Sequence, residues 1–246
     1  MNAERSATHT FHHASQLRAE HPRLAAGVLF AVGISADADV SGPVEHLTGI
    51  ASSRLSAASE SELPEVQAWR RAFSRMGLKP TQFRCASESL LRRLRKEGAL
   101  PRIHPLIDLC NAASVAFATP VAVLDVSKIT WPLEVRHASG DEQYTTFSGE
   151  IENPAPGEVI FADSAGRAHA RRWTNRQSGY SAVNDATDSV LIVAEALHES
   201  ALTDIQELTA TLTNALNTIW AVVPATAILT HQQPRFDFSP AQHVTS

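Results

Sequence analysis

Apolar residues recur every three or four positions in four segments of the chain, and this spacing predicts four helices. In the first segment, Val66, Trp69 and Phe73 share one face, which is typical of a helix that packs against a core. Residues of the kinds that begin and end helices flank these segments. The expected helices cover residues 61–76, 87–98, 106–117 and 202–220.

Between the third and fourth helices the pattern changes to short apolar or alternating runs, separated by glycine and proline, which predicts strands. One further strand precedes the first helix and another follows the last. The expected strands cover residues 28–34, 121–124, 133–137, 144–147, 158–162, 168–173, 190–194 and 225–230. The economical packing of these elements is an α+β fold, with mixed β-sheet and helices on one face.

The ends of the chain lack such patterns. We expect a flexible N-terminal segment over residues 1–24, one domain over 25–232 and an irregular tail over 233–246. Residues 35–43 are expected to form a loop. The N-terminal region is polar and lacks the apolar stretch of a secretory signal, so we expect a cytoplasmic protein.

Composition agrees with a globular protein of ordinary type. The chain has 246 residues, of which 43% are hydrophobic and 19% are charged, so it has enough apolar surface to build a core without disulfides or metal. No stretch is long and apolar enough for a membrane span. Its two cysteines, Cys85 and Cys110, are expected to be small buried hydrophobic residues.

The formal net charge of −5 argues against broad binding to nucleic acid, so we expect neither DNA nor a membrane as a partner. Positive charge is nevertheless concentrated in two clusters. Either cluster can be a solvated surface or a local phosphate-binding site. The clusters are Arg92, Arg93, Arg95 and Lys96, and Arg167, Arg171, Arg172 and Arg176.

Several common catalytic motifs are absent. The sequence contains no P-loop, no G-x-G-x-x-G, no G-x-S-x-G and no H-E-x-x-H. The histidines do not combine with the cysteines at metal-ligand spacing, and His9, His12 and His13 are expected to lie in a flexible polar tail. We therefore expect no metal and no other cofactor.

Four segments stand out by their order and composition. They read LIDLCNAASVAFATPVAVLD (106–125), PLEVRHA (132–138), PGEVIFAD (156–163) and RRWTNRQSGYSAVNDATDSVLIVAEAL (171–197). This ordered set resembles the editing domain of the phenylalanyl-tRNA synthetase β subunit, the B3/B4 domain. Residues 68–94 are similar to the leader of free-standing members of that family, and the resemblance covers roughly residues 65–198.

The resemblance implies a β/β/α layered fold and a tRNA-related activity. The parent domain hydrolyses tRNA charged with the wrong amino acid, usually tyrosine. A free-standing relative would be an aminoacyl-tRNA deacylase that acts in trans on the 3′ end of an aminoacylated tRNA. Such an ester is already activated, so a catalyst mainly has to position water and the terminal ribose.

Three polar residues in the matched segments are candidates for the chemistry. Asn111 can donate a hydrogen bond to the substrate or bridge the helix to the next turn, and Glu158 can orient a water or the amino acid's ammonium group, or form a salt bridge. Arg136 can meet a phosphate or a carboxylate, or pair with Asp125 or Glu158. We assign Asn111 and Glu158 to catalysis and Arg136 to substrate binding.

A polar and aromatic loop between two predicted strands is a candidate for binding the end of the tRNA. An indole, a guanidinium and amides are suited to stacking on an adenine and to hydrogen bonding with a ribose. The alternative is a tryptophan packed on the core with solvated neighbours. The loop residues are Trp173, Asn175, Arg176, Gln177 and Ser178.

The chain departs from the family at two places. Ala122 stands where the family turn carries histidine, and the sequence WTNRQSGYSA replaces a Gly-rich loop with an acidic residue. Three functions therefore remain open: a deacylase acting in trans, a non-catalytic module that binds tRNA or an amino acid, and a small-molecule hydrolase or ligand-binding protein. The ordered family match favours the first.

Overall fold

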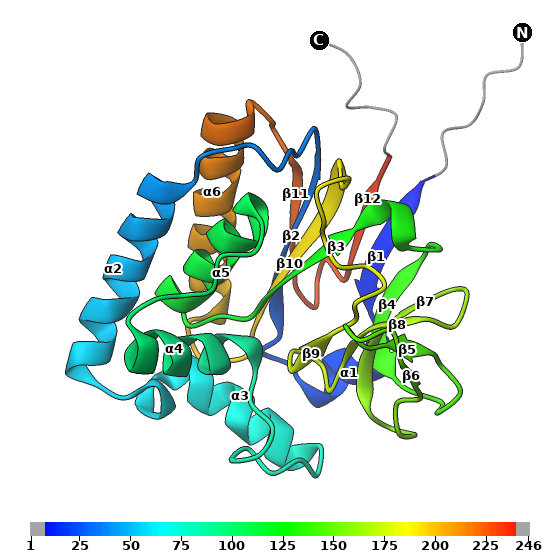
Figure 1. The fold of residues 1–246 in the computed structure, drawn as a ribbon. Helices are drawn as coiled ribbons and strands as arrows, with labels where there is room; N and C mark the ends of the chain where they lie inside the picture. Colours follow the sequence, from blue (N-terminus) through cyan, green and yellow to red (C-terminus); the bar gives the residue numbers. More distant parts are fainter. Residues whose placement is uncertain (1–7, 240–246) are drawn as a thin grey trace, which may run out of the picture.

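Two β-sheets packed face to face and one layer of helices make up residues 8–239, the part of the chain that the computed structural model describes (Figure 1). The six-stranded sheet contains, in spatial order, β12 (Arg235–Phe238), β1 (His9–His13), β4 (Leu133–His137), β7 (Val159–Asp163), β8 (Ala168–Arg171) and β9 (Arg176–Gln177). The four-stranded sheet contains β11 (Ala225–Leu229), β2 (Ala25–Val32), β10 (Ser189–Ala196) and β3 (Val121–Asp125). A small hairpin joins β5 (Tyr144–Thr145) and β6 (Ile151–Glu152).

Helices cover the outer face of the four-stranded sheet, so the layers follow the expected β/β/α order. Figure 1 shows α2, α5 and α6 on this side, and α3 and α4 below them. None of the helices in the described residues has the length and apolar character that crossing a bilayer requires. The helices are α1 (Ser15–Glu20), α2 (Ser41–Ala57), α3 (Pro64–Arg75), α4 (Ala86–Glu97), α5 (Pro105–Ala116) and α6 (Ala201–Trp220).

Strand β10 lies in the middle of the molecule and is buried on both faces. Because side chains alternate along a strand, Leu191 and Val193 point into the core between the two sheets, whereas Val190 and Ile192 point toward the helices. Glu195 follows Val193 by two positions and belongs to the face between the sheets. A carboxylate is thereby carried into an apolar layer.

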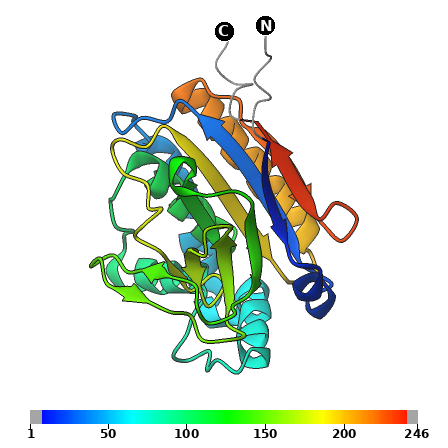
Figure 2. The same cartoon turned by 90° about the vertical axis from the view of Figure 1, so that its right-hand side faces the viewer.

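The expectation of irregular chain ends is wrong for the described residues. Strand β1 pairs in parallel with β4 and antiparallel with β12, and Figure 2 shows the red β12 beside the blue N-terminal strands. Phe11 is fully buried, and Phe236 and Phe238 pack in the same core. These strands are short alternations of aromatic and polar residues, and they pair with each other across more than 200 residues of chain, while β1 also pairs with β4 more than 100 residues away. The expected flexible segment and irregular tail also include residues 1–7 and 240–246, which lie outside the described residues.

The helix α2 also differs from the prediction, which ended a loop at residue 43. Only Leu47 and Ala51 are buried in this helix, so its apolar spacing is too sparse to stand out. Helix α3 begins at Pro64, because a 3₁₀ turn over Glu60–Glu62, closed by a capping box from Ser59, precedes it. Other predicted elements lie within a few residues of the observed ones.

Packing of α6 on β2 depends on Gly27. A Cβ atom at this position would lie 2.2 Å from Thr209 Oγ1 and 3.2 Å from Ile205 Cγ2. We therefore predict that Gly27→Ala lowers the free energy of unfolding by about 1–3 kcal/mol, as overpacking does, measured by urea denaturation. The matched control is Gly49→Ala in α2, where nothing lies within 4 Å; helix propensity there predicts a gain of about 0.5–1 kcal/mol. Equal stability of Gly27→Ala and the parent protein would contradict this packing.

Candidate functional site

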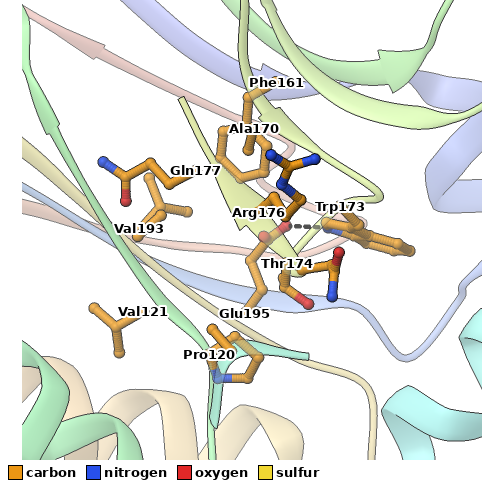
Figure 3. Close-up of a pocket in the computed structure, with 13 residues that line it drawn as sticks. Pro120, Val121, Phe161, Ala170, Trp173, Thr174, Arg176, Gln177, Val193 and Glu195 are labelled. Carbon is orange, nitrogen blue, oxygen red and sulfur yellow. Dashed lines mark hydrogen bonds between the residues drawn. The ribbon is translucent and has the colours of Figure 1, made fainter. Parts of the chain in front are cut away.

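A cavity of about 60 Å³ lies between the two sheets (Figure 3). It is lined by residues of β9, of the start of β3 and of the end of β10. One wall is apolar and consists of Pro120, Val121, Ala122, Phe161, Ala170 and Val193. The other residues include a buried carboxylate and a polar turn, namely Glu195, Trp173, Thr174, Asn175, Arg176 and Gln177. An anionic group thus faces an apolar wall across a space of a few water molecules.

Glu195 is the most deeply buried charge of this cavity, with 1% of its surface exposed. Its Oε1 accepts hydrogen bonds from Trp173 Nε1 at 2.9 Å, drawn in Figure 3, and from His13 Nε2 at 2.7 Å. Both donors use the same oxygen, so Oε2 is the atom that a ligand in the cavity would meet. A buried carboxylate needs such donors to remain ionised.

Arg18 fixes the proton of His13. Its Nη2 lies 3.0 Å from His13 Nδ1, and a guanidinium can only donate hydrogen bonds. Nδ1 is therefore an acceptor, and the imidazole carries its proton on Nε2, where it donates to Glu195. Burial lowers the pKa of His13, which agrees with a neutral ring. The connected set Arg18, His13, Glu195 and Trp173 is called the Glu195 network below.

The turn that carries Trp173 has an unusual backbone. Arg172 and Trp173 have φ angles of 46° and 57°, in the left-handed region that residues other than glycine seldom adopt, at a cost of about 1–3 kcal/mol each. Glu158 Oε1 accepts the backbone N–H of Arg172 at 2.9 Å, and the N–H of Trp173 donates to Val159 O at 2.7 Å. These bonds hold the turn so that the indole reaches Glu195.

Glu158 therefore holds this turn in position, and the geometry does not support its assignment to catalysis at this cavity. Arg171 donates to both of its carboxylate oxygens at 2.9 Å. Burial favours the protonated form, but the hydrogen bonds and the charge of Arg171 outweigh it and hold the pKa of Glu158 below its usual value. The carboxylate has its partners already, and it does not line the cavity, so it is not placed to orient a water there.

Four of the five predicted loop residues line the cavity. Asn175 Nδ2 donates to Arg84 O at 2.7 Å and Gln177 Nε2 donates to Val123 O at 2.6 Å. Arg176 is exposed, with its guanidinium carbon 5.3 Å from the centre of the Tyr144 ring. The fifth residue, Ser178, is fully buried and donates to Thr145 O at 2.8 Å, so it belongs to the structure of the turn.

Two other predicted site residues lie away from the cavity. Asn111 is half-buried on α5 and is not among the lining residues. Arg136 alternates with Val135, which faces the core, so its side chain lies on the outer face of the six-stranded sheet. There it bonds Glu142 and not Asp125 or Glu158. The geometry does not support the assignment of Asn111 to catalysis or of Arg136 to substrate binding at this cavity.

The sequence interpretation missed Glu195, His13 and Arg18. A usable signal existed for Glu195, because it is the single charged residue in the apolar run 190–197, and such a residue must be buried with partners. No local signal existed for His13, which meets Glu195 from 182 positions away. Its expected place in a flexible tail is wrong, since it is 2% exposed in β1.

A second polar set has the order of a hydrolase triad but a structural role. Ser181 Oγ lies 2.8 Å from His169 Nδ1, and His169 Nε2 lies 3.3 Å from Asp163 Oδ2. Ser181 and His169 have no exposed surface, and neither lines the cavity between the sheets. A substrate has no path to this serine, so the set gives no support to a small-molecule hydrolase.

Among the described residues, one set has the composition of a metal site. Glu65, His198 and Asp204 offer ligand atoms within 4.8 Å of one another. Arg54 already pairs with Glu65 at 2.6 Å, and His198 Nε2 lies 2.6 Å from Asp204 Oδ2. An ion would have to compete with the guanidinium for Glu65, and the set lies outside the cavity.

Comparison with known proteins identifies the family of this chain. A family model described as the B3/4 domain matches residues 68–219. The chain belongs to the B3/4 domain family.

Two curated proteins similar to this B3/4 domain chain are phenylalanine–tRNA ligase beta subunits. The chain is 32% identical to that of Shewanella oneidensis over 101 residues, and 29% identical to that of Cereibacter sphaeroides over 123 residues. These matches cover 41% and 50% of this chain, but only 12% and 15% of the two subunits. A solved N-terminal fragment of the phenylalanyl-tRNA synthetase beta subunit from Pyrococcus horikoshii has a TM-score of 0.46 and 10% identity, covering 98% of this chain and 56% of the fragment.

Three of the four segments that carried the resemblance, 106–125, 156–163 and 171–197, contribute residues to the cavity. Pro120, Val121 and Ala122 form one edge, and the turn that replaces the family's Gly-rich loop forms another. Ala122, which stands at the position of the family histidine, is part of the lining. Asp125 accepts the Ser127 N–H at 2.9 Å and caps a 3₁₀ turn, which is a structural role. Cys85 and Cys110 are buried, and burial raises their pKa values to about 11 and about 12.

Histidines around the site make stability depend on pH. His21 lies edge-on to Trp173 at 4.9 Å; burial and then the charge of Arg75 lower its pKa from 6.5 to about 4, and burial lowers that of His13. The unfolded chain therefore binds more protons between about pH 6.5 and 4, and the free energy of unfolding falls as pH drops through this window. Each such histidine contributes at most about 1.4 kcal/mol per pH unit.

We predict that urea denaturation gives a smaller pH slope for His21→Gln than for the parent protein between about pH 6.5 and 4. The control variant is His231→Gln, because the side chain of His231 is exposed to solvent. An unchanged slope in His21→Gln would contradict the assignment.

Proposed function

We propose that this B3/4 domain chain is an aminoacyl-tRNA deacylase that hydrolyses mischarged tRNA in trans. The observation that carries the proposal is the buried Glu195 carboxyl group, hydrogen-bonded by Trp173 and His13, in a small cavity lined by three of the family's segments. The related ligase subunits act on tRNA by name, which supports a tRNA substrate for this chain.

The size of the cavity suits the amino acid and not a nucleoside. At about 10–15 Å³ for each water-sized group, about 60 Å³ holds four to six such groups. The α-ammonium group of the esterified amino acid would meet Glu195 Oε2 in a charge-assisted hydrogen bond, and its side chain would lie against Val121 and Phe161. The terminal adenosine would then lie at the mouth, beside the exposed Arg176 and the amides of Asn175 and Gln177.

The chemistry asked of the protein is modest. Water attacks the ester carbonyl carbon, the ribose hydroxyl leaves, and the free amino acid and tRNA are released. Holding the ester and the water in one geometry supplies most of the effect that such an activated bond needs. The rigid Glu195 network is suited to this, because its carboxylate is fixed by two donors before any substrate binds.

One observation favours a second function, which is binding without hydrolysis. Ala122 lines the cavity where the family turn carries histidine, so no imidazole faces the ester from that position. A protein that relied on this histidine for proton transfer would keep affinity and lose turnover.

We predict that the parent protein releases amino acid from at least one member of a panel of mischarged tRNAs, and that Glu195→Gln lowers kcat/KM for that tRNA by about tenfold to a hundredfold, the size expected for losing a charge-assisted contact. Release of radiolabelled amino acid measures this. Glu207→Gln on the exposed face of α6 is the isosteric control and should behave like the parent.

If no tRNA in the panel releases its amino acid, the result contradicts the hydrolase proposal. If tRNA still bound, the binding module would take its place, and Ala122→His would then test whether restoring an imidazole to the cavity restores turnover. Equal rates for Glu195→Gln and the parent protein would remove Glu195 from the site.

A further inference from the structure

The two arginine clusters that the sequence suggested for phosphate binding are largely neutralised within the protein. In the first, Arg92 and Arg95 both meet Glu60, and Arg93 pairs with Glu97. In the second, carboxylates pair with three of the four arginines. These pairs are Arg167 with Asp163, Arg171 with Glu158 and Glu152, and Arg176 with Glu152. A carboxylate next to an arginine weakens the electrostatic attraction of that arginine for a phosphate.

A further concentration of positive charge lies on α3 and the loop that follows it. Residues 66–87 contain five basic residues and no acidic one, in a chain whose net charge is −5. Arg70 and Arg84 pair with Glu88 from α4. The other three, Arg71, Arg75 and Lys79, are exposed and form no ion pair in the described part of the chain.

This charge is connected to the candidate site. The guanidinium carbon of Arg172 lies 4.6 Å from the centre of the Phe83 ring, so the turn before Trp173 rests on the loop after α3. Ala86 N donates to Thr174 O at 2.8 Å, and Trp69 of α3 contacts Trp173 edge-on at 4.9 Å. Arg172 forms no ion pair with a carboxylate among the described residues. We call Arg71, Arg75, Lys79 and Arg172 the α3 basic surface.

The form of this surface fits an extended phosphate chain. Arg70, Arg71, Ser74 and Arg75 line a shallow depression of about 410 Å³, and α3 runs along the edge of the molecule in Figure 1. None of the large exposed apolar residues of the described chain lies between 66 and 87. A membrane surface or a protein interface would use such apolar contacts, whereas phosphate contacts require only cations.

We propose that the α3 basic surface binds backbone phosphates of the tRNA strand that leads to the 3′ end, while the inter-sheet cavity holds the aminoacyl group. This inference rests on the proposed function in taking tRNA as the ligand. Affinity for the tRNA body and chemistry at its end are then carried by separate residues, joined through Phe83, Arg172 and the Trp173 turn.

The test measures binding of uncharged tRNA by filter binding between 50 and 300 mM salt. The variant Arg71→Gln/Arg75→Gln/Lys79→Gln is compared with Arg93→Gln/Lys96→Gln/Arg102→Gln, which removes the same three charges from exposed positions at the far end of α4 and the following loop. Each triple changes the net charge equally, so a general electrostatic effect would move both alike. Circular dichroism checks that both triples are folded.

We expect the α3 triple to reduce the slope of log K against log salt by about 2, at roughly 0.7 per lost phosphate contact, and to weaken binding at 100 mM salt at least tenfold. The α4 triple should stay within twofold of the parent protein. Equal loss in both triples, no loss in the α3 triple, or no binding of tRNA by the parent protein would overturn the surface.

The two proposals fail in different ways. If the α3 triple loses binding but no mischarged tRNA is hydrolysed, the surface stands and the deacylase proposal falls. If hydrolysis is found but the α3 triple binds and reacts normally, the deacylase stands and the surface falls.

Discussion

The structure is organised around a carboxylate in an apolar layer. Glu195 sits between two sheets, where an ionised group is stable only with donors held close to it. Those donors come from elements far apart in the chain, His13 from the N-terminal strand and Trp173 from the turn before β9. The same requirement that keeps the charge in place therefore ties the first strand to the middle of the molecule.

The partners of Glu195 explain two features that a purely apolar core would not require. The left-handed backbone at Arg172 and Trp173 is unfavourable by itself, and it is held by Glu158 so that the indole can reach Glu195. Arg18 sets the tautomer of His13 from one side. Glu158 and Arg18 thus hold the partners of Glu195 in position. The cavity beside this carboxylate is the candidate ligand site.

Much of the fold follows from local patterns, because helices α3 to α6 and strand β10 bury regular apolar faces that the sequence displays. Strands β1 and β12 were not predictable in this way, since each is four or five residues long and is stabilised by the other across the whole chain. Helix α2 buries too few residues to reveal itself.

The candidate site likewise combines residues that local sequence patterns indicate with residues that only the tertiary structure brings together. The loop from Trp173 to Gln177, which lines the cavity, was selected as a candidate because its composition is unusual over a few neighbouring residues. Asn111 and Arg136 were assigned to the site but lie away from this cavity, because residue type alone does not tell which face of a helix or strand a side chain occupies. Glu195 was missed although its position in an apolar run was informative, and the neutralisation of the arginine clusters depended on pairs such as Arg95 with Glu60 that only the tertiary structure brings together.

In the proposed function, the Glu195 carboxylate receives the ammonium group of an aminoacylated adenosine. Calorimetric titration with a stable amide analogue, 3′-aminoacylamino-3′-deoxyadenosine, tests it without any need for turnover. We expect saturable binding to the parent protein, at least tenfold weaker binding to Glu195→Gln, and loss of affinity when the α-amino group of the analogue is acetylated. Binding that is indifferent to Glu195 and to the amino group, or no binding of any analogue in the series, would contradict it.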